Sequence, residues 1–159
     1  MKKDGTLVPG TRPWYGRSII RSTAKLDYGL AQRLIDSGME AEWVGPKGIH
    51  TKQQVVESLR NLHKLGMARR AMRFDPKSGG ALSMSAVKMS FDLDMDTGNP
   101  IGVKRYPMYD TNSMVEEYML LANYLVAQRL IEGARSNAFL RHHPPPDAKQ
   151  MQAVAQVGF

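Results

Sequence analysis

The stretch "YDTNSMVEEYMLLANYLVAQRL", Tyr109 to Leu130, decides the fold, because it carries a long apolar helical pattern. Ser113 and Glu116 match the S-x-x-E capping box, which predicts a helix that follows Ser113 and begins at Met114. The apolar residues behind it fall on two adjacent ridges, formed by Met114, Tyr118, Leu121 and Leu125, and by Val115, Met119, Ala122 and Val126. Few polar residues remain, so we expect this helix to be central to a larger structure. Asn123 is then expected to be buried and to bond to backbone or a neighbouring side chain.

Two further helices are predicted upstream of this stretch. Asp27 can cap a helix over about 28–37, whose apolar residues lie on one side. Thr51 and Gln54 form a second capping box, T-x-x-Q, ahead of a helix over about 52–74. The second half of that helix is basic, and cations suit the negative end of a helix dipole. This is the plainest explanation of a run that contains Lys64, Arg69, Arg70 and Arg73.

Extended segments complete the expected fold. "RSIIRSTAKL" (17–26) is typical of a strand, and segments 81–95 and 101–109 predict a β-hairpin joined at the turn "DTGNP". The sequence therefore predicts an α+β fold, in which a β-hairpin or small antiparallel sheet packs with about three helices. Residues 1–13 are expected to form an irregular lead-in, and residues 148–159 a tail with a short helix.

The hairpin contains the alternating acids of "FDLDMDTGNP", which raise the question of a metal site. An EF-hand loop that began at Asp92 would need Gly where Thr97 stands and Glu where Val103 stands. In a strand, Asp92, Asp94 and Asp96 share one face but lie about 6–7 Å apart in a row. We therefore predict no metal site in this chain, and a solvated face for these carboxylates.

Composition bounds the function. The chain has 159 residues, enough for one domain with a core, and 22 basic against 15 acidic residues give a net charge of +7. Such a balance favours polyanionic partners, nucleic acid first and acidic membrane or protein second. No segment is long and apolar enough to span a bilayer, and no secretory signal is recognised. The absence of cysteine excludes disulfides, thiolate metal ligands and a cysteine nucleophile, and it fits a reducing compartment.

Several blocks together resemble a known family. The helix "NSMVEEYMLLAN" is similar to the N-x-[ML]-V-E-E-x-M-[LI]-x-A-N helix of the RNase II/RNB family of 3′→5′ exoribonucleases. "WYGRSIIRSTAKLDYGLAQRLIDS" resembles the family segment W-[FY]-G-R-[ST]-[VI]-I-[RK]-S-x-A-K-L-x-Y-x-x-A-Q. "GALSMSAVKMSFDLDMDTGNPIGV" resembles the family hairpin, and "AFLRHHPPP" its "LLRRHPPP" stretch. These blocks keep the family order over 14–147, and they are most similar to eukaryotic members that work with or beside the exosome.

The resemblance implies a middle segment of an RNB catalytic domain. It implies hydrolytic 3′→5′ degradation of single-stranded RNA that threads a basic channel, with Mg²⁺ as cofactor. The family's metal-binding aspartates belong to a D-x-x-x-x-x-D-I-D-D type signature, expected upstream of this segment, and its late catalytic arginine is expected beyond Phe159. We therefore expect no catalytic residue in this chain. The expected partners are single-stranded RNA, the remainder of the catalytic domain or a partner chain, and the exosome. The expected location is intracellular, cytoplasmic rather than nuclear.

Two residues match family positions that bind RNA. Tyr28 matches a tyrosine near the 3′-terminal nucleotide, and a tyrosine can stack on a base or donate to a phosphate. Glu116 matches a glutamate close to the cleavage site, and a carboxylate can accept from ribose hydroxyls. The alternatives are that Tyr28 packs at a corner and that Glu116 only completes the capping box of Ser113. Three cations at spacing four along the predicted strand could meet phosphates or form a solvated face: Arg17, Arg21 and Lys25.

Two functions of different classes follow. One is a segment of an exoribonuclease that positions the RNA 3′ end in the channel. The alternative is a non-catalytic, RNB-derived RNA-binding or scaffold subunit of a ribonucleoprotein.

Overall fold

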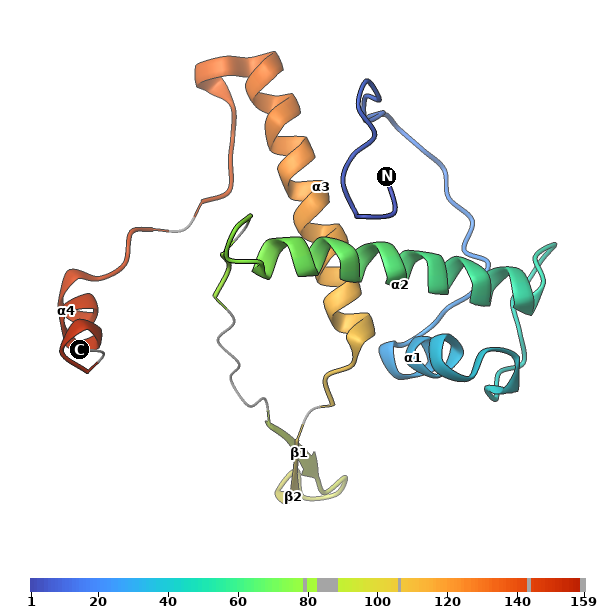
Figure 1. The fold of residues 1–159 in the computed structure, drawn as a ribbon. Coiled ribbons are helices and arrows are strands. Elements are labelled where there is room, and N and C mark those ends of the chain that lie inside the picture. Colours follow the sequence, from blue (N-terminus) through green and yellow to red (C-terminus); the bar gives the residue numbers. More distant parts are fainter. Residues whose placement is uncertain (79, 83–88, 106, 143, 158–159) are drawn as a thin grey trace. The chain divides into compact units, whose positions relative to one another are not determined.

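The computed structural model describes residues 1–78, 80–82, 89–105, 107–142 and 144–157, and these form an α+β fold (Figure 1). Four helices and one antiparallel two-stranded sheet lie within them. Their order is α1 (Tyr28–Ser37), α2 (Lys52–Phe74), β1 (Met89–Leu93), β2 (Pro100–Arg105), α3 (Asp110–Ala134) and α4 (Ala148–Val157). The predicted fold class is confirmed, and α4 lies in the tail where a short helix is expected. The chain divides into two units, residues 1–122 and 123–159.

Helix α1 begins and ends at local signals. The side chain of Asp27 accepts a hydrogen bond from the backbone N–H of Leu30 at 2.8 Å, which satisfies one of the unpaired donors of the first turn. At the other end Gly38 takes a left-handed conformation, with φ of 60°, and its N–H returns to the carbonyl of Leu34. Both boundaries agree with the prediction.

Helix α2 also begins where its capping box predicts. Gln54 N–H donates to Thr51 Oγ1 at 3.2 Å, and Thr51 N–H donates to Gln54 Oε1 at 2.9 Å. The first half of α2 packs against α1 and the loop between them. The core there consists of Leu34, Ala41 and Val56, with Leu26, Leu30, Trp43 and Leu59 partly buried against it.

Helix α3 begins at Asp110, four residues before the predicted start at Met114, so the Ser113–Glu116 capping box is wrong. Instead, the backbone N–H of Tyr109 donates to Asn112 Oδ1 at 3.0 Å, which ties down the chain just before the helix. The expected burial of Asn123 is also wrong, because that residue is exposed. The buried residues of α3 all lie in its first two turns: Thr111, Met114 and Glu117.

Beyond those turns α3 presents large apolar side chains to solvent, so in this chain it is central only at its N-terminal end. The exposed set is Met119, Leu120, Tyr124, Val126, Leu130 and Ile131. An unmet apolar face of this kind is typical of a surface that other protein covers.

The β-hairpin is shorter than predicted. Phe91 pairs with Val103, and Leu93 pairs with Pro100, across a bulge after Asp92. Residues 83–88 of the expected first strand lie outside the described residues. Asp94 and Asp96 are not strand residues, so the row of carboxylates on one strand face is wrong. Asp94 belongs to the turn, where its N–H donates to the carbonyl of Asn99 at 2.8 Å.

The strand predicted at 17–26 is wrong as well. Within the described residues this segment is irregular and pairs with neither β1 nor β2. β-branched residues favour a pleated surface only where another strand supplies partners, so propensity alone does not make a strand. The carbonyl of Thr23 instead accepts from the backbone N–H of Lys47 at 2.8 Å, which ties the segment to the loop after α1.

In the unit formed by residues 123–159, helix α4 begins at a cap from Asp147, whose Oδ1 accepts from the N–H groups of Lys149 and Gln150, each at 3.0 Å. Across the described segments, no helix has both the length and the hydropathy needed to cross a bilayer.

Candidate nucleic-acid interface at the crossing of α2 and α3

Helices α2 and α3 cross (Figure 1), and Gly66 of α2 lies against Met114 of α3. Gly66 is buried, and a methyl group in place of its hydrogen would lie 3.2 Å from Cγ and 3.4 Å from Cα of Met114. The two backbones therefore approach closely. Tyr118 secures the same crossing, because its hydroxyl donates to the carbonyl of Leu62 at 2.9 Å. Burial raises the pKa of Tyr118, which keeps this hydroxyl protonated and able to donate.

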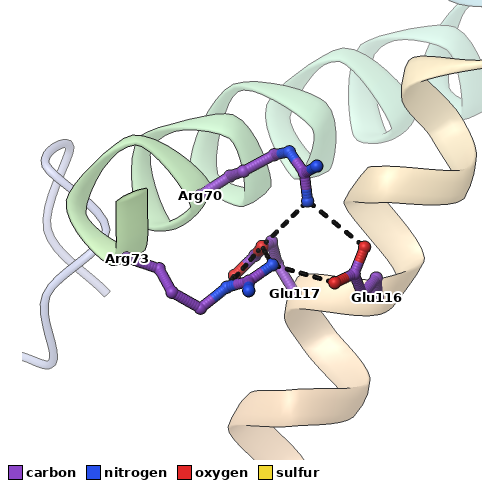
Figure 2. A network of polar contacts seen from close by, with 4 residues as sticks. All are labelled: Arg70, Arg73, Glu116 and Glu117. Carbon is purple, nitrogen blue, oxygen red and sulfur yellow. Dashed lines mark hydrogen bonds and ion pairs between the residues drawn. The ribbon is translucent and has the colours of Figure 1, made fainter. Parts of the chain in front are cut away.

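One turn further along α2, four charged side chains form a network across the crossing (Figure 2). Arg73 Nε donates to both carboxylate oxygens of Glu117, at 3.0 and 3.3 Å, and its Nη2 donates to Glu117 Oε1 at 2.6 Å. The same Nη2 reaches Glu116 Oε1 at 2.9 Å. Arg70 Nη1 lies 3.2 Å from Glu116 Oε2 and 3.4 Å from Glu117 Oε1. Each arginine therefore contacts both glutamates.

The two glutamates differ in burial, because neighbouring residues point about 100° apart around a helix. The side chain of Glu117 is 3% exposed, whereas that of Glu116 is 49% exposed. Both arginine side chains are 29% exposed. The hydrogen bonds that Arg73 donates to Glu117 raise the pKa of Arg73 above its ordinary value. Glu117 is thus the buried anchor of the network, and Glu116 is its solvent-facing member.

An aromatic ring supports both cations. The guanidinium carbons of Arg70 and Arg73 lie 4.7 and 4.5 Å from the centroid of the Phe74 ring. A cation at this distance from a ring is attracted to its π face. Phe74 therefore restricts where the two guanidinium groups can lie.

Tyr28, the first residue of α1, is tied to the first turn of α3. Its carbonyl accepts from Thr111 Oγ1 at 2.9 Å, and the N–H of Thr111 donates to Gln32 Oε1 at 3.1 Å. Thr111 is fully buried, whereas Tyr28 is 41% exposed. Thr111 precedes Glu116 by five residues, about 7.5 Å along the helix axis. Of the two predicted RNA-contacting residues, Glu116 thus belongs to the N-terminal part of α3, and the backbone of Tyr28 is bonded to that part through Thr111.

The three predicted phosphate contacts lie elsewhere. Arg17, Arg21 and Lys25 are exposed on the irregular segment before α1. Because this segment is no strand, their spacing of four does not put them on one strand face. None of the ion pairs found among the described residues includes them.

The acids of the hairpin do not fit a magnesium ion. Asp94 Oδ1 accepts from the N–H groups of Asp96 and Thr97 and from the Thr97 hydroxyl, at 2.7 to 3.0 Å. These bonds, above all the one from the Thr97 N–H, hold the pKa of Asp94 below its ordinary value. Asp92 pairs with Lys104 Nζ at 2.6 Å. In the part of the chain that the structure describes, no three metal-ligating side chains gather.

Sequence reasoning missed the network of four charged side chains between α2 and α3. It took Arg70 and Arg73 as helix-dipole partners and took Glu116 as a candidate alone. The available signal was the coincidence of two arginines at spacing three on one helix with adjacent glutamates on another. The spacing shows that each pair can present two charges to one neighbour, but it does not show that the two helices meet.

Comparison with known proteins now gives the family. A family model described as the RNB domain matches residues 1–157. The chain belongs to the RNB domain family. Among related proteins, "DIS3-like exonuclease 2" of Xenopus tropicalis is 39% identical over 147 residues, which cover 90% of this chain and 17% of the relative. "Exosome complex exonuclease RRP44" of Homo sapiens is 36% identical over 143 residues, covering 90% of this chain and 14% of the relative.

A third relative bears the name of an inactive protein. "Inactive exonuclease DIS3L2" of Arabidopsis thaliana is 32% identical over 142 residues, covering 87% of this chain and 13% of that protein. In each of these three cases the chain spans less than a fifth of the relative's length. The family resemblance inferred from the sequence motifs is confirmed.

Proposed function

We propose that this chain is a segment of a hydrolytic 3′→5′ exoribonuclease that degrades single-stranded RNA, and that it positions the RNA 3′ end in a basic channel. Family membership and exonuclease relatives support the reaction class. The observation that carries the positioning role is Glu116. It is a half-exposed carboxylate whose two oxygens are each held by an arginine.

Glu116 has the chemistry to recognise ribose. Each of its oxygens receives one arginine hydrogen bond, at 2.9 and 3.2 Å, and a carboxylate oxygen can accept two. One acceptor site on each oxygen therefore remains for a hydroxyl that approaches from solvent. A ribose 2′-hydroxyl is such a donor, and DNA lacks it.

Tyr28 would act beside it. Its side chain is exposed enough to meet a base, while its backbone is fixed to Thr111. Stacking of a base on an aromatic ring tolerates any sequence, which suits an enzyme that removes nucleotides one at a time. Arg17, Arg21 and Lys25 would contact phosphates further along the strand, in keeping with the net charge of +7.

Mg²⁺ is the cofactor that the family resemblance implies. The acids described here do not fit it, because Asp92 and Asp94 are already engaged within the hairpin. We assign no residue of this chain to a metal and no catalytic group to this chain.

The proposed partners are single-stranded RNA and protein that covers the exposed apolar residues of α3. That protein would be the remainder of the catalytic domain or a partner chain. The exosome is proposed as a further partner, because one relative bears the name of an exosome complex exonuclease. We propose an intracellular location, cytoplasmic rather than nuclear.

A second function is a non-catalytic, RNB-derived RNA-binding or scaffold subunit. The relative named an inactive exonuclease favours it, because that protein shares 32% identity over most of this chain.

One assay separates the two functions. The 159-residue chain, together with the remainder of the catalytic domain that the first function requires, is incubated with 5′-labelled single-stranded RNA and Mg²⁺, with and without EDTA, and that remainder alone is the control. A ladder of shortened products that EDTA abolishes supports the enzyme. Retarded RNA without a ladder supports the binding subunit. Failure to bind the RNA even at low salt would contradict both.

A further inference from the structure

The two arginines of the network differ in the glutamate that each one contacts most closely: Glu117 for Arg73 and Glu116 for Arg70. Resting on the role proposed for Glu116, we propose that Arg70 is a positioning residue. It orients the Glu116 carboxylate toward a ribose hydroxyl and so contributes to the preference for RNA over DNA.

Arg73 serves chiefly the buried anchor. Three of its four hydrogen bonds go to Glu117, which is 3% exposed, and one goes to Glu116. A planar guanidinium that meets a carboxylate with two nitrogens fixes it in one geometry. Arg73 therefore holds α2 against α3, and its loss would disturb the fold before it disturbed recognition.

Arg70 is different, because its shorter contact is to the solvent-facing glutamate. Its Nη1 lies 3.2 Å from Glu116 Oε2 and 3.4 Å from Glu117 Oε1. With Arg73 Nη2 on the opposite oxygen at 2.9 Å, Glu116 is held from both sides. Without Arg70 only one oxygen would be fixed, and the carboxylate could rotate about its terminal bond.

Charge balance points the same way. The network contains two guanidinium cations and two carboxylates, so its net charge is zero. A lone carboxylate would repel the phosphates on either side of a bound ribose. The arginines remove this repulsion while leaving half of the Glu116 side chain exposed. The Phe74 ring, 4.7 Å from the Arg70 guanidinium carbon, limits the positions that Arg70 can take.

The test compares the affinities of the 159-residue chain for single-stranded RNA and single-stranded DNA of equal sequence, measured by fluorescence anisotropy. A single hydrogen bond to a charged group corresponds to a preference of about tenfold for RNA. Arg70→Gln should reduce this RNA-to-DNA ratio about threefold or more. Glu116→Gln should reduce it as well, and the double variant should fall no further than Glu116→Gln alone, because Arg70 acts through Glu116.

Arg129→Gln is the charge control, since it removes the same charge from an exposed residue outside the network. It should weaken RNA and DNA binding equally. Arg70→Lys keeps the charge but loses the planar guanidinium that lies against the Phe74 ring, so this variant should keep the wild-type affinity for DNA and still show a reduced ratio. Arg70→Lys also replaces Arg70→Gln in the test if Arg70→Gln does not fold. Thermal unfolding followed by circular dichroism shows whether each variant is folded.

The possible results distinguish the positioning role of Arg70 from the ribose recognition proposed for Glu116. A wild-type chain with no preference for RNA would contradict the proposed role of Glu116 and, with it, that of Arg70. A wild-type preference that survives in Arg70→Gln and Arg70→Lys would overturn the positioning role alone. A wild-type ratio in Arg70→Lys by itself would also overturn it, because charge would then suffice.

Discussion

Arg73 and Glu117 form a bidentate ion pair between α2 and α3, with three hydrogen bonds of 2.6 to 3.3 Å. The carboxylate is almost completely buried, and the guanidinium is about one-third exposed. A buried carboxylate is stable only while its partner remains, whereas the partly exposed cation can turn to water. The two members of the pair should therefore differ in what their removal costs.

Arg73→Leu should lower the free energy of unfolding by about 3 kcal/mol, because it leaves the buried Glu117 carboxylate with only the 3.4 Å contact from Arg70. Arg73→Leu combined with Glu117→Leu should recover most of that loss, since no buried charge then remains. Urea unfolding followed by circular dichroism measures both. Arg33→Leu, an exposed residue of α1, is the control and should change stability by less than about 0.5 kcal/mol. A double variant less stable than Arg73→Leu alone would contradict this account.

Gly66 should not accept a larger side chain. Even a methyl group at this position would lie 3.2 Å from Met114, so the larger side chain of Gly66→Leu should cost about 1–3 kcal/mol of stability. Gly133→Leu is the matched control, because nothing lies within 4 Å of a Cβ atom at that position of α3. Leucine is a better helix former than glycine, so this variant should gain about 0.5–1 kcal/mol. Equal effects of the two substitutions on the melting temperature would show that the crossing is not tight.

The helix boundaries that could be predicted are those set by neighbouring residues. Asp27 and the Thr51–Gln54 pair define the starts of α1 and α2 within three residues of sequence, and both helices begin as expected. The start of α3 is predicted from the Ser113–Glu116 spacing, but the helix begins earlier, at Asp110. Glu116 pairs with Arg70, 46 residues away, rather than with Ser113. A contact between residues so far apart in the sequence cannot be predicted from the spacing of residues within one helix.

The strand predicted at 17–26 fails for a related reason. β-propensity describes fitness for a paired surface, and whether a partner strand is present is a property of the fold. The same limit applies to the candidate site. Tyr28 and Glu116 were found through the motif resemblance. The network of Arg70, Arg73 and Glu117 depends on the crossing of two helices, which only the folded structure reveals.

Asp94 should titrate below its ordinary pKa of 3.8, because the N–H and hydroxyl of Thr97 bond to its ionised form. A pKa that is lower in the folded hairpin than in the unfolded chain means that Asp94 stabilises the turn above pH 3.8. This contribution is lost as the pH falls through the folded value. Carboxyl-carbon NMR titration measures the midpoint. Thr97→Val removes the hydroxyl donor and keeps the backbone N–H, so it should move the midpoint part of the way back toward 3.8. An unchanged midpoint would show that the Thr97 hydroxyl does not contribute.

Tyr28→Ala should weaken single-stranded RNA binding about tenfold, because it removes a ring on which a base could stack. Tyr28→Phe should retain most of the affinity if stacking is the main contribution, and lose it if the hydroxyl contacts a phosphate. Tyr124→Ala is the control, since Tyr124 is an equally large and more exposed tyrosine outside the proposed interface. Fluorescence anisotropy with a labelled oligonucleotide gives the three affinities. A loss in Tyr124→Ala that equals the loss in Tyr28→Ala would remove Tyr28 from the interface.

Thr111 should couple the helix scaffold to RNA binding, because its buried hydroxyl donates to the carbonyl of Tyr28 at 2.9 Å. Thr111→Val keeps the shape of the side chain and removes the donor, so stability should fall by about 1 kcal/mol. The start of α1 would then be held less firmly, and RNA affinity should fall about threefold, since positioning of Tyr28 is weakened rather than lost. Thr111→Ser keeps the donor but loses a buried methyl group, so it should cost a similar stability of about 0.8 kcal/mol and leave RNA affinity near wild type. Unfolding and binding measured on both variants separate the two effects. A Thr111→Ser chain that binds RNA more weakly than Thr111→Val would show that packing, and not the hydrogen bond, holds Tyr28 in place.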